Sequence, residues 1–483
     1  MTERFLLAID NGSQSTKVTI FDPQGIVHAS AQRPLRPYDT SLPGHVVHPD
    51  DDLWDSIRAT CREAIQRFPG DPSQITAIGL CTIRFCRALL NADGLLVEPV
   101  LSWMDVRVDQ PHDPTDTRVA HVTTSSGYIT GRLTGRLVDT RANYQGLWPI
   151  DQRTGNWSTD PAAYRATGMP RRLLLDLVSP GDLLGTVTPE AAAATGIPLG
   201  LPVYATANDK AVEALGCGLT NQDAVLLSLG TYIAAMTVGT SAVTGAADYW
   251  VNFAATPGTY LYESRGIRRG MWTVSWFRDL VADPVGPNSK GQPPDDLLDR
   301  EAADVPPGSG GLMTLLDWLA PTEAPYRRGA FLGFDGTQGR GHIYRSILEG
   351  IALTMAGHIT SMEHALGRHF ETAIISGGGS RSDLMMQILA NVLNRPAQRA
   401  GMSDAAGLGA AICAAVGSAV HPNWDAATTQ MVTPGTTFTP RPQHVTAYRD
   451  IARDYARITE YTDPLFAGTT QNERQVLSAT KGL

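Results

Sequence analysis

The chain has 483 residues, well beyond the 100–200 residues of a typical domain, so we expect two domains or one large duplicated fold. The net charge of −9 disfavours nucleic acid as a partner, and five scattered cysteines without a CxxC pair are expected to be reduced thiols rather than disulfides or zinc ligands. The N-terminus lacks a signal-peptide pattern and the longest apolar stretch, residues 224–239, is too short and too polar to span a bilayer, so we expect a soluble cytoplasmic protein with no membrane partner.

The first half of the chain alternates strand-like and helix-like segments. Residues 5–10 and 17–22 are apolar runs joined by the small polar turn NGSQST, which predicts a β-hairpin. From Trp54 to Phe68 apolar residues recur every three or four positions, which predicts a helix. Strands are predicted over 75–80 and 203–209, and the second of these runs directly into a helical segment. This alternation predicts an α/β fold.

The second half repeats the hairpin. Residues 225–230 and 232–238 are strand-like around a turn at Gly230, which lies 218 residues after Gly12, so the spacing supports an internal duplication. A strand over 372–376, a glycine turn and an amphipathic helix over 384–392 follow. Residues 283–296 are predicted to be a surface loop, 433–442 a linker, and 443–461 a closing amphipathic helix.

Two turns have the composition of phosphate-binding loops. In DNGSQSTK the glycine and hydroxyl residues let backbone N–H groups approach a phosphate, and Asp10 at the strand end could hold a cation. SLGT, residues 228–231, has the same chemistry. A plain tight hairpin explains either turn equally well, but two such turns could bind a triphosphate from both sides.

Two further segments could act on a hydroxyl compound. Asp209 lies where a buried strand gives way to a helix, a position suited either to accepting a hydroxyl proton or to capping that helix. In SWMDVR, Trp103, Asp105 and Arg107 could stack on and hydrogen-bond to a polyol. A half-buried tryptophan beside a surface ion pair is the alternative interpretation of that segment.

A third glycine cluster, SGGGSRS, stands between a strand and a helix, where backbone donors and the helix dipole favour a nucleotide. It nearly matches a dinucleotide-binding fingerprint, since Gly377 and Gly379 fit. However, Ser382 stands in place of the last glycine, and the acid Asp404 follows 27 residues after Gly377, rather far for a ribose contact.

The order of these motifs over residues 5–417 resembles the FGGY carbohydrate kinase family, which includes glycerol kinase, xylulokinase and ribulokinase. The segments that carry the resemblance are the turn from Asp10 to Lys17, Trp103 to Arg107, YITGRLTGRLVDT (128–140), TANDKAVEALGCG around Asp209, SLGT, GMWTVSWFRD (270–279), residues 326–355, and GGGSRSDLMMQILANVLNRP followed by SDAAGLGAA.

The resemblance implies two actin-like (ribonuclease H-like) ATPase domains of the α/β class, over 1–220 and 221–483, with a ligand cleft between them. It also implies an ATP-dependent carbohydrate kinase that uses Mg²⁺, with Asp209 as the catalytic base and Asp10 near the metal. The implied sugar contacts are Arg84, Trp103, Asp105 and Asp209. The implied contacts to ATP are Gly12, Ser13, Ser15, Lys17, Gly230, Thr231, Gly270, Gly377, Gly378, Gly379 and Ser382.

The segment CTIRFC departs from the family pattern. Arg84 aligns with an arginine of glycerol kinases, but Phe85 replaces a glutamate or histidine, and an apolar ring cannot accept hydroxyl hydrogen bonds. The substrate is therefore open, with ketopentoses such as xylulose or ribulose as the leading class. A catalytically silent actin-like sensor and a nicotinamide-dependent oxidoreductase are the alternatives, and the sequence leaves a homodimer open.

Overall fold

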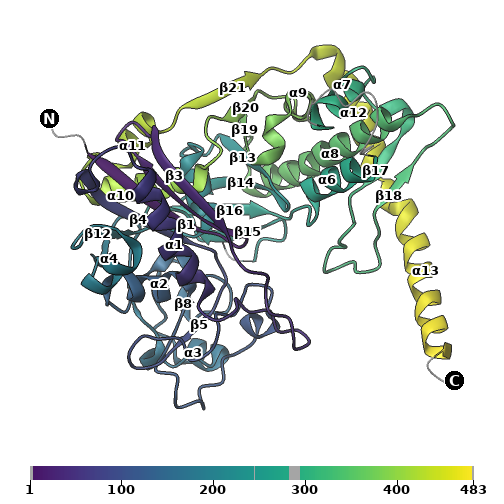
Figure 1. Ribbon diagram of the computed structural model, residues 1–483. Helices are drawn as coiled ribbons and strands as arrows, with labels where there is room; N and C mark the ends of the chain where they lie inside the picture. The colour runs from purple at the N-terminus through teal and green to yellow at the C-terminus, as the bar shows by residue number, and fades with distance from the viewer. Residues whose placement is uncertain (1–3, 244, 282–293, 481–483) are drawn as a thin grey trace.

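The computed structural model describes residues 4–243, 245–281 and 294–480 and contains two large mixed sheets (Figure 1). In spatial order the first sheet consists of β11 (Leu183–Thr186), β12 (Pro202–Ala205), β4 (Ile75–Thr82), β1 (Phe5–Asn11), β2 (Ser15–Phe21) and β3 (Val27–Pro34). The second consists of β15 (Tyr249–Phe253), β16 (Tyr260–Ser264), β14 (Ile233–Gly239), β13 (Ala224–Leu229), β19 (Thr372–Ser376), β20 (Ala397–Ala400) and β21 (Pro434–Phe438).

The two sheets share one topology. In the first, β3, β2 and β1 form an antiparallel meander, β1, β4 and β12 are parallel, and β11 closes the edge antiparallel. The second repeats this pattern with β16, β14 and β13, then β13, β19 and β20, then β21, and adds β15 at one edge. The predicted hairpins and the predicted duplication are therefore confirmed.

Helices cover the faces of both sheets. The α-helices of the described residues are α1 (Asp52–Arg67), α2 (Ser125–Thr134), α3 (Pro161–Thr167), α4 (Pro189–Thr195), α5 (Asp209–Gly216), α6 (Gly270–Val281), α7 (Pro294–Ala303), α8 (Arg340–Leu366), α9 (Asp383–Leu393), α10 (Ala405–Gly417), α11 (Trp424–Met431), α12 (Pro442–Tyr455) and α13 (Ile458–Thr480). Short strand pairs are β5 (Ala88–Leu90) with β6 (His121–Thr123), β7 (Val138–Thr140) with β10 (Asp176–Val178), β8 (Ile150–Asp151) with β9 (Asn156–Trp157), and β17 (Met313–Leu315) with β18 (Ala330–Leu332).

The two halves meet through α5 and α10, which pack closely against each other, and α10 also packs on β1 and β4 of the first sheet. Small residues make this contact possible. A Cβ atom added to Gly216 would lie 1.9 Å from the carbonyl oxygen of Ala405, and one added to Gly409 would lie 1.9 Å from that of Val212. Any side chain at either position would push the helices apart, which fixes how the halves approach each other.

The C-terminal segment departs from the sequence-based prediction. The linker predicted over 433–442 is wrong, because Pro434–Phe438 forms β21 on the edge of the second sheet. The helix predicted over 443–461 is two helices, α12 and α13, and α13 projects from the body of the molecule (Figure 1). Most of the loop predicted over 283–296 lies outside the described residues, and its last residues begin α7.

Among the described residues, no helix is both long enough and apolar enough to cross a bilayer. The five cysteines are free and buried, as predicted. The domain boundary at residue 220 stays a prediction; it falls between α5 and β13, where the chain passes from the first sheet to the second.

Candidate active site

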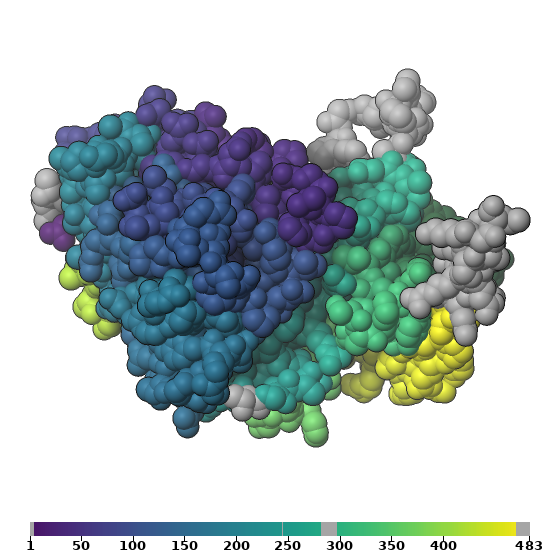
Figure 2. Space-filling view, turned by 90° about the horizontal axis from the view of Figure 1, so that it is seen from below, coloured from purple at the N-terminus to yellow at the C-terminus, as the bar shows by residue number. Residues whose placement is uncertain are grey.

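A cleft of about 1800 Å³ lies between the two halves, and Figure 2 looks onto a face where the purple-to-blue first half meets the green second half. Residues from the turns of both hairpins line it. Those of the predicted site residues that line the cleft are Ser13, Arg84, Trp103, Asp209, Gly230 and Thr231. The structure thus gathers residues from opposite ends of the sequence into one cavity.

Asp209 is the first residue of α5, and its carboxylate is not used as the helix cap. The side chain of Asn208 caps the helix, with its oxygen accepting from the backbone N–H of Ala211 at 3.1 Å. Asp209 accepts only the adjacent backbone N–H of Lys210, at 2.9 Å, among the contacts of the described residues. Burial raises the pKa of Asp209, although Arg84 and Lys210 oppose this shift. The capping role considered for Asp209 therefore belongs to its neighbour.

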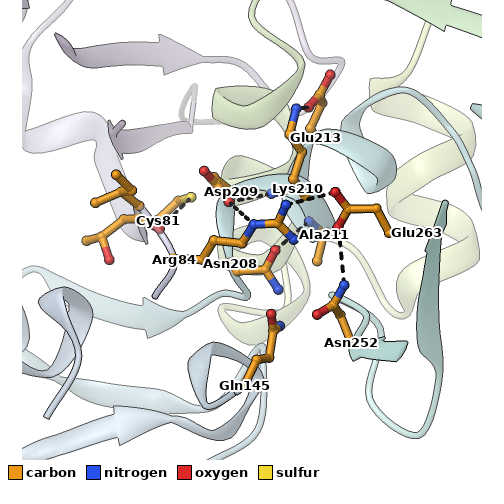
Figure 3. Close-up of polar contacts among 12 residues, drawn as sticks. Cys81, Arg84, Gln145, Asn208, Asp209, Lys210, Ala211, Glu213, Asn252 and Glu263 are labelled. Atoms are coloured by element: carbon orange, nitrogen blue, oxygen red, sulfur yellow. Dashed lines mark hydrogen bonds and ion pairs between the residues drawn. The ribbon is translucent and has the colours of Figure 1, made fainter. Parts of the chain in front are cut away.

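Arg84 follows β4 and crosses to the second half of the molecule. Its two terminal nitrogens donate to the two carboxylate oxygens of Glu263 at 2.6 and 2.8 Å, and its Nε lies 3.7 Å from Asp209 (Figure 3). Glu263 is fully buried on β16 and also accepts from Asn252 at 3.3 Å. The guanidinium is thus held rigidly beside the Asp209 carboxylate by a partner from the other sheet.

Glu263 is a residue that the sequence analysis missed. Its only local signal is a single charged side chain inside the buried strand Tyr260–Ser264. The partner that explains this charge stands 179 positions earlier in the chain.

Phe85 gives the cleft an apolar wall. Its backbone has φ of 63°, in the left-handed region that few bulky residues adopt, and its ring lies 5.2 Å from the guanidinium carbon of Arg84. Strained backbone of this kind concentrates at functional sites, where surrounding contacts hold it in place. The side chain thus shapes the cleft without offering a hydrogen bond.

Trp103 and Asp105 have different environments. Trp103 is 48% exposed and lines the cleft. Asp105 is buried; it accepts from the guanidinium of Arg107 at 2.8 and 2.9 Å and from the backbone N–H of Val46 at 2.8 Å. Asp105 does not line the cleft, and it anchors the loop that contains Val46. Its predicted contact to a sugar stays a prediction.

The first hairpin carries charged residues on its strands. Asp10 and Lys17 are cross-strand partners, and the backbone N–H of Gly12 donates to the carbonyl of Ser15 at 3.0 Å across the turn. Lys17 forms an ion pair with Asp404 at 3.3 Å. Burial, together with the carboxylates of Asp404 and Asp209, raises the pKa of Asp10 to about 7, although Lys17 opposes the shift.

The glycine turns of the second half lie together. The backbone N–H of Gly270, at the start of α6, donates to the carbonyl of Thr231 at 2.7 Å. Gly377 has φ of +82°, and a Cβ atom there would lie 2.6 Å from the carbonyl oxygen of Leu229. A Cβ atom on Gly379 would lie 2.7 Å from the sulfur of Met271. The second hairpin, the start of α6 and the third glycine cluster therefore pack against one another.

The dinucleotide interpretation of that cluster has no support in the geometry. Asp404 accepts from the hydroxyl of Thr19 at 2.7 Å and pairs with Lys17, both on the first sheet. Ser382 caps α9, since its hydroxyl accepts from the backbone N–H of Met385 at 3.1 Å.

Comparison with known proteins agrees with this geometry. Residues 5–113 and 108–216 match the N-terminal domain, and residues 225–418 the C-terminal domain, of the FGGY family of carbohydrate kinases. The chain belongs to this family. It is therefore an ATP-dependent sugar kinase built from two actin-like domains, as the resemblance implied, and neither the silent sensor nor the nicotinamide enzyme finds support.

The relatives do not agree on a substrate. The chain is 43% identical over 466 residues to YgcE, an uncharacterized sugar kinase of Escherichia coli K12, covering 96% of this chain and 95% of YgcE. It is 25% identical to the autoinducer-2 kinase of the same strain, over 92% of each chain. The crystal structure of xylulose kinase from Rhodospirillum rubrum superimposes with a TM-score of 0.84 and 26% identity, covering 96% of this chain and 100% of that one.

Proposed function

We propose that this kinase phosphorylates a hydroxyl group of a small uncharged sugar, with ketopentoses such as xylulose or ribulose as the leading class. The observation that carries the proposal is the arrangement of Arg84, which lies beside the Asp209 carboxylate and is paired in bidentate fashion with buried Glu263. The likeness to a xylulose kinase structure at 26% identity supports the ketopentose class.

Asp209 is the proposed catalytic base. Its carboxylate lies in the cleft and is free to accept the proton of the attacking sugar hydroxyl, because Asn208 caps the helix instead. As the sugar oxygen forms its bond to phosphorus, the bond from phosphorus to the leaving oxygen of ADP breaks and ADP takes that electron pair. The raised pKa of Asp209 makes the carboxylate a better proton acceptor than an exposed aspartate.

The Arg84–Glu263 pair supports an uncharged substrate. Glu263 already neutralises the guanidinium, so a sugar acid would have to compete with a buried glutamate for the same donors. Each terminal nitrogen of Arg84 keeps one N–H beyond those given to Glu263, and Nε–H adds a third. These donors suit the hydroxyl or carbonyl oxygens of a neutral sugar, with Trp103 available as a flat apolar surface.

The ATP contacts proposed here are the turns at Ser13 and at Gly230–Thr231, with the adenosine against Gly377–Gly379 and Ser382 nearby. Asp10 is the proposed residue near Mg²⁺. No three His, Cys, Asp or Glu side chains of the described residues are grouped to hold a metal ion. That fits Mg²⁺, which commonly binds through one or two carboxylates together with substrate phosphates and water. When bound, the metal ion neutralises part of the phosphate charge.

The test is an ADP-release screen over tetruloses, ketopentoses, ketohexoses, polyols, the matching aldonic acids and the substrate of the autoinducer-2 kinases. We expect the highest kcat/KM for a ketopentose and negligible turnover of its aldonate. A clear preference for a sugar acid would overturn the uncharged-substrate proposal. A preference for another neutral class would overturn only the ketopentose assignment.

Glu263→Gln sharpens the same test. Removing this negative charge takes away the bidentate partner of the Arg84 guanidinium and leaves only Asp209 beside it, so an aldonate can pair with the freed donors. We therefore expect the ratio of kcat/KM for the ketopentose over the matching aldonate to fall at least ~10-fold. Glu460→Gln is the control, because it removes a charge from an exposed glutamate on α13 that pairs with Arg457. That control should leave the ratio unchanged.

A further inference from the structure

Lys210 is a cation in the cleft that no role assigned above explains. It follows Asp209 in the first turn of α5 and lines the cleft, with its side chain 21% exposed. Its ammonium nitrogen lies 2.8 Å from a carboxylate oxygen of Glu213 and 3.0 Å from the hydroxyl oxygen of Ser228 (Figure 3 shows it beside Asp209 and Glu213). Ser228 belongs to the second hairpin, so Lys210 lies between the proposed base and that hairpin.

The orientation of this lysine is fixed from the second half of the molecule. One carboxylate oxygen of Glu213 accepts from Ser228 at 2.7 Å and from Ser376 at 2.7 Å. Ser228 lies two residues before Gly230, and Ser376 immediately precedes Gly377. Lys210 and Glu213 are thus tied to the bases of both glycine turns that the ATP contacts use.

Lys210 is charged and still has a donor to give. Burial works against the ammonium, but Glu213 and Asp209 raise the pKa of Lys210 above its ordinary value. An ammonium has three N–H donors, and the contacts of the described residues use two of them. The third is available to a ligand in the cleft.

Its position is unfavourable for the helix alone. The first turn of a helix stabilises anions and repels cations, and the ion pair with Glu213, three residues on in α5, offsets part of this repulsion. Oxygen atoms of a phosphate would satisfy the remaining donor and offset that repulsion.

The choice of lysine is itself informative. The chain has 39 lysines and arginines, of which only four are lysines, at positions 17, 210, 290 and 481. The two within the described residues, Lys17 and Lys210, are on the first hairpin and against the second. Elsewhere the described chain uses arginine for positive charge. Lysine binds phosphate as a compact point charge with three rotatable donors, without the fixed planar geometry of a guanidinium.

We propose that Lys210 is a phosphate-binding residue of this kinase, and that its ammonium group contacts the phosphoryl group that is transferred. It lies on the path between Asp209, which takes the hydroxyl proton, and the second hairpin, which binds the phosphates. Charge develops on the phosphoryl oxygens during transfer, and a fixed cation there stabilises the transition state. Glu213 is then a positioning residue, which acts by orienting the ammonium.

The first experiment needs no sugar, so it is independent of the ketopentose assignment. Lysine labelled with ¹³C at Cε gives at most four side-chain signals, and the signal that disappears in Lys210→Met identifies Lys210. Saturating Mg²⁺ with a non-hydrolysable ATP analogue should shift that signal. The signals of Lys290 and Lys481, assigned by the same kind of substitution, serve as references. An unchanged Lys210 signal at saturation would overturn the proposal.

The second experiment measures turnover with the sugar that the screen identifies. We expect Lys210→Met to lower kcat by ~10²–10³ with little change in the KM of the sugar, the loss typical of one electrostatic donor. In Lys210→Met the buried carboxylate of Glu213 loses its ion-pair partner, which could destabilise the fold. The double variant Lys210→Met/Glu213→Gln removes that unpaired charge and should show the same loss of kcat. A kcat within threefold of the parent in either variant would contradict the proposal.

Chemical rescue separates charge from packing. Lys210→Cys can be aminoethylated to a lysine analogue, and the five native cysteines are buried, which favours reaction at the introduced thiol. Aminoethylation should restore kcat at least ~10-fold, whereas the neutral group added by iodoacetamide should not. Equal rescue by both reagents would assign Lys210 a packing role and overturn phosphate binding.

Discussion

The two hairpins of this kinase have the same fold but obtain their charges in different ways. The first hairpin carries Asp10 and Lys17 as cross-strand partners on its own strands. The second, from Ala224 to Gly239, has no charged residue at all. On the side of Ser228 the charges are those of Lys210 and Glu213, which α5 of the first half brings against this hairpin. The two hairpins therefore share their backbone geometry, but the charged groups beside Ser228 of the second hairpin are present only because the two halves are in contact.

The charge distribution has a consequence for mechanism. The proposed base, the proposed phosphate lysine and the sugar-side arginine all belong to the first half. The second half supplies hydroxyl groups, backbone donors and the buried Glu263 that orient them. We therefore expect changes in the first half to act on turnover and on sugar binding, and changes in the second half to act on ATP binding and on positioning.

The largest expected effect is that of Asp209→Asn. The variant keeps the size of the side chain but cannot accept the hydroxyl proton, so we expect kcat to fall at least ~10²-fold with ATP binding retained. Steady-state kinetics and calorimetric titration with ATP measure the two quantities. Near-normal turnover of this variant would show that Asp209 is not the catalytic base.

The contact between the halves should be the next most sensitive feature. Gly409→Ala places a methyl group 1.9 Å from the carbonyl oxygen of Val212, so we expect the free energy of unfolding to fall by about 3 kcal/mol as α5 and α10 separate. Gly357→Ala in α8 is the matched control, because nothing lies within 4 Å of its added Cβ, and it should be neutral or slightly stabilising. Equal stability of the two variants in urea would show that the helix contact tolerates a side chain.

Gly377→Ala tests the glycine turn of the second half. Its positive φ and the 2.6 Å approach to the carbonyl of Leu229 exclude a Cβ without a backbone shift. We expect a loss of about 1–2 kcal/mol in stability and a rise in the KM for ATP with less effect on the sugar KM. For stability, Gly378→Ala is the comparison, since its added Cβ comes no closer than 3.9 Å to a neighbour. Equal melting temperatures of Gly377→Ala and Gly378→Ala would show that position 377 tolerates a side chain.

Asp10 should make the stability of the first hairpin depend on pH, whereas the second hairpin has no charged residue that could do so. Because its pKa is raised to about 7 in the folded protein, the native state holds a proton that the unfolded chain releases above about pH 4. The contribution of Asp10 to the free energy of unfolding therefore falls as the pH rises from 4 to 7, because the unfolded chain releases the proton that the native state keeps. Asp10→Asn should stabilise the metal-free protein by up to about 4 kcal/mol at pH 8 and by almost nothing at pH 4.

The same substitution should weaken Mg²⁺-dependent turnover more than sugar affinity. Melting curves at the two pH values and a Mg²⁺ titration of activity provide the measurements. A stability gain that is equal at both pH values would show that Asp10 does not titrate in this range. Loss of sugar affinity without a change in the Mg²⁺ dependence of activity would show that Asp10 belongs to the sugar site and not to the metal site.

The smallest expected effect is a change of shape. Phosphate-binding turns in each half can grip one triphosphate only if the halves approach, and a kinase must keep water from the reacting phosphate. Sugar together with a non-hydrolysable ATP analogue should reduce the radius of gyration more than either ligand alone, with the hinge near residues 218–224. Small-angle scattering measures this, and an unchanged radius at saturation would count against closure.

Local patterns were sufficient for much of this protein. Alternating apolar runs and small polar turns identified both hairpins. The change of period between strand and helix identified β12 and α5, although β12 ends at Ala205 and not at residue 209 as predicted. The order of the motifs identified the family, because each motif depends on short-range backbone geometry that the sequence encodes directly.

Only the tertiary structure revealed the contacts between residues that lie far apart in the chain. Glu263 is paired with Arg84 from 179 positions away, and Ser376 reaches Glu213 over 163 positions, so no local pattern marked either contact. The edge strand β21 was missed because Pro434–Phe438 is proline- and glycine-rich, and only β20 beside it makes it a strand. The sequence by itself determined which residue types could perform phosphoryl transfer. Packing of α5 against α10 determined which of them meet, because a buried charge finds its counter-charge only when the two halves are in contact.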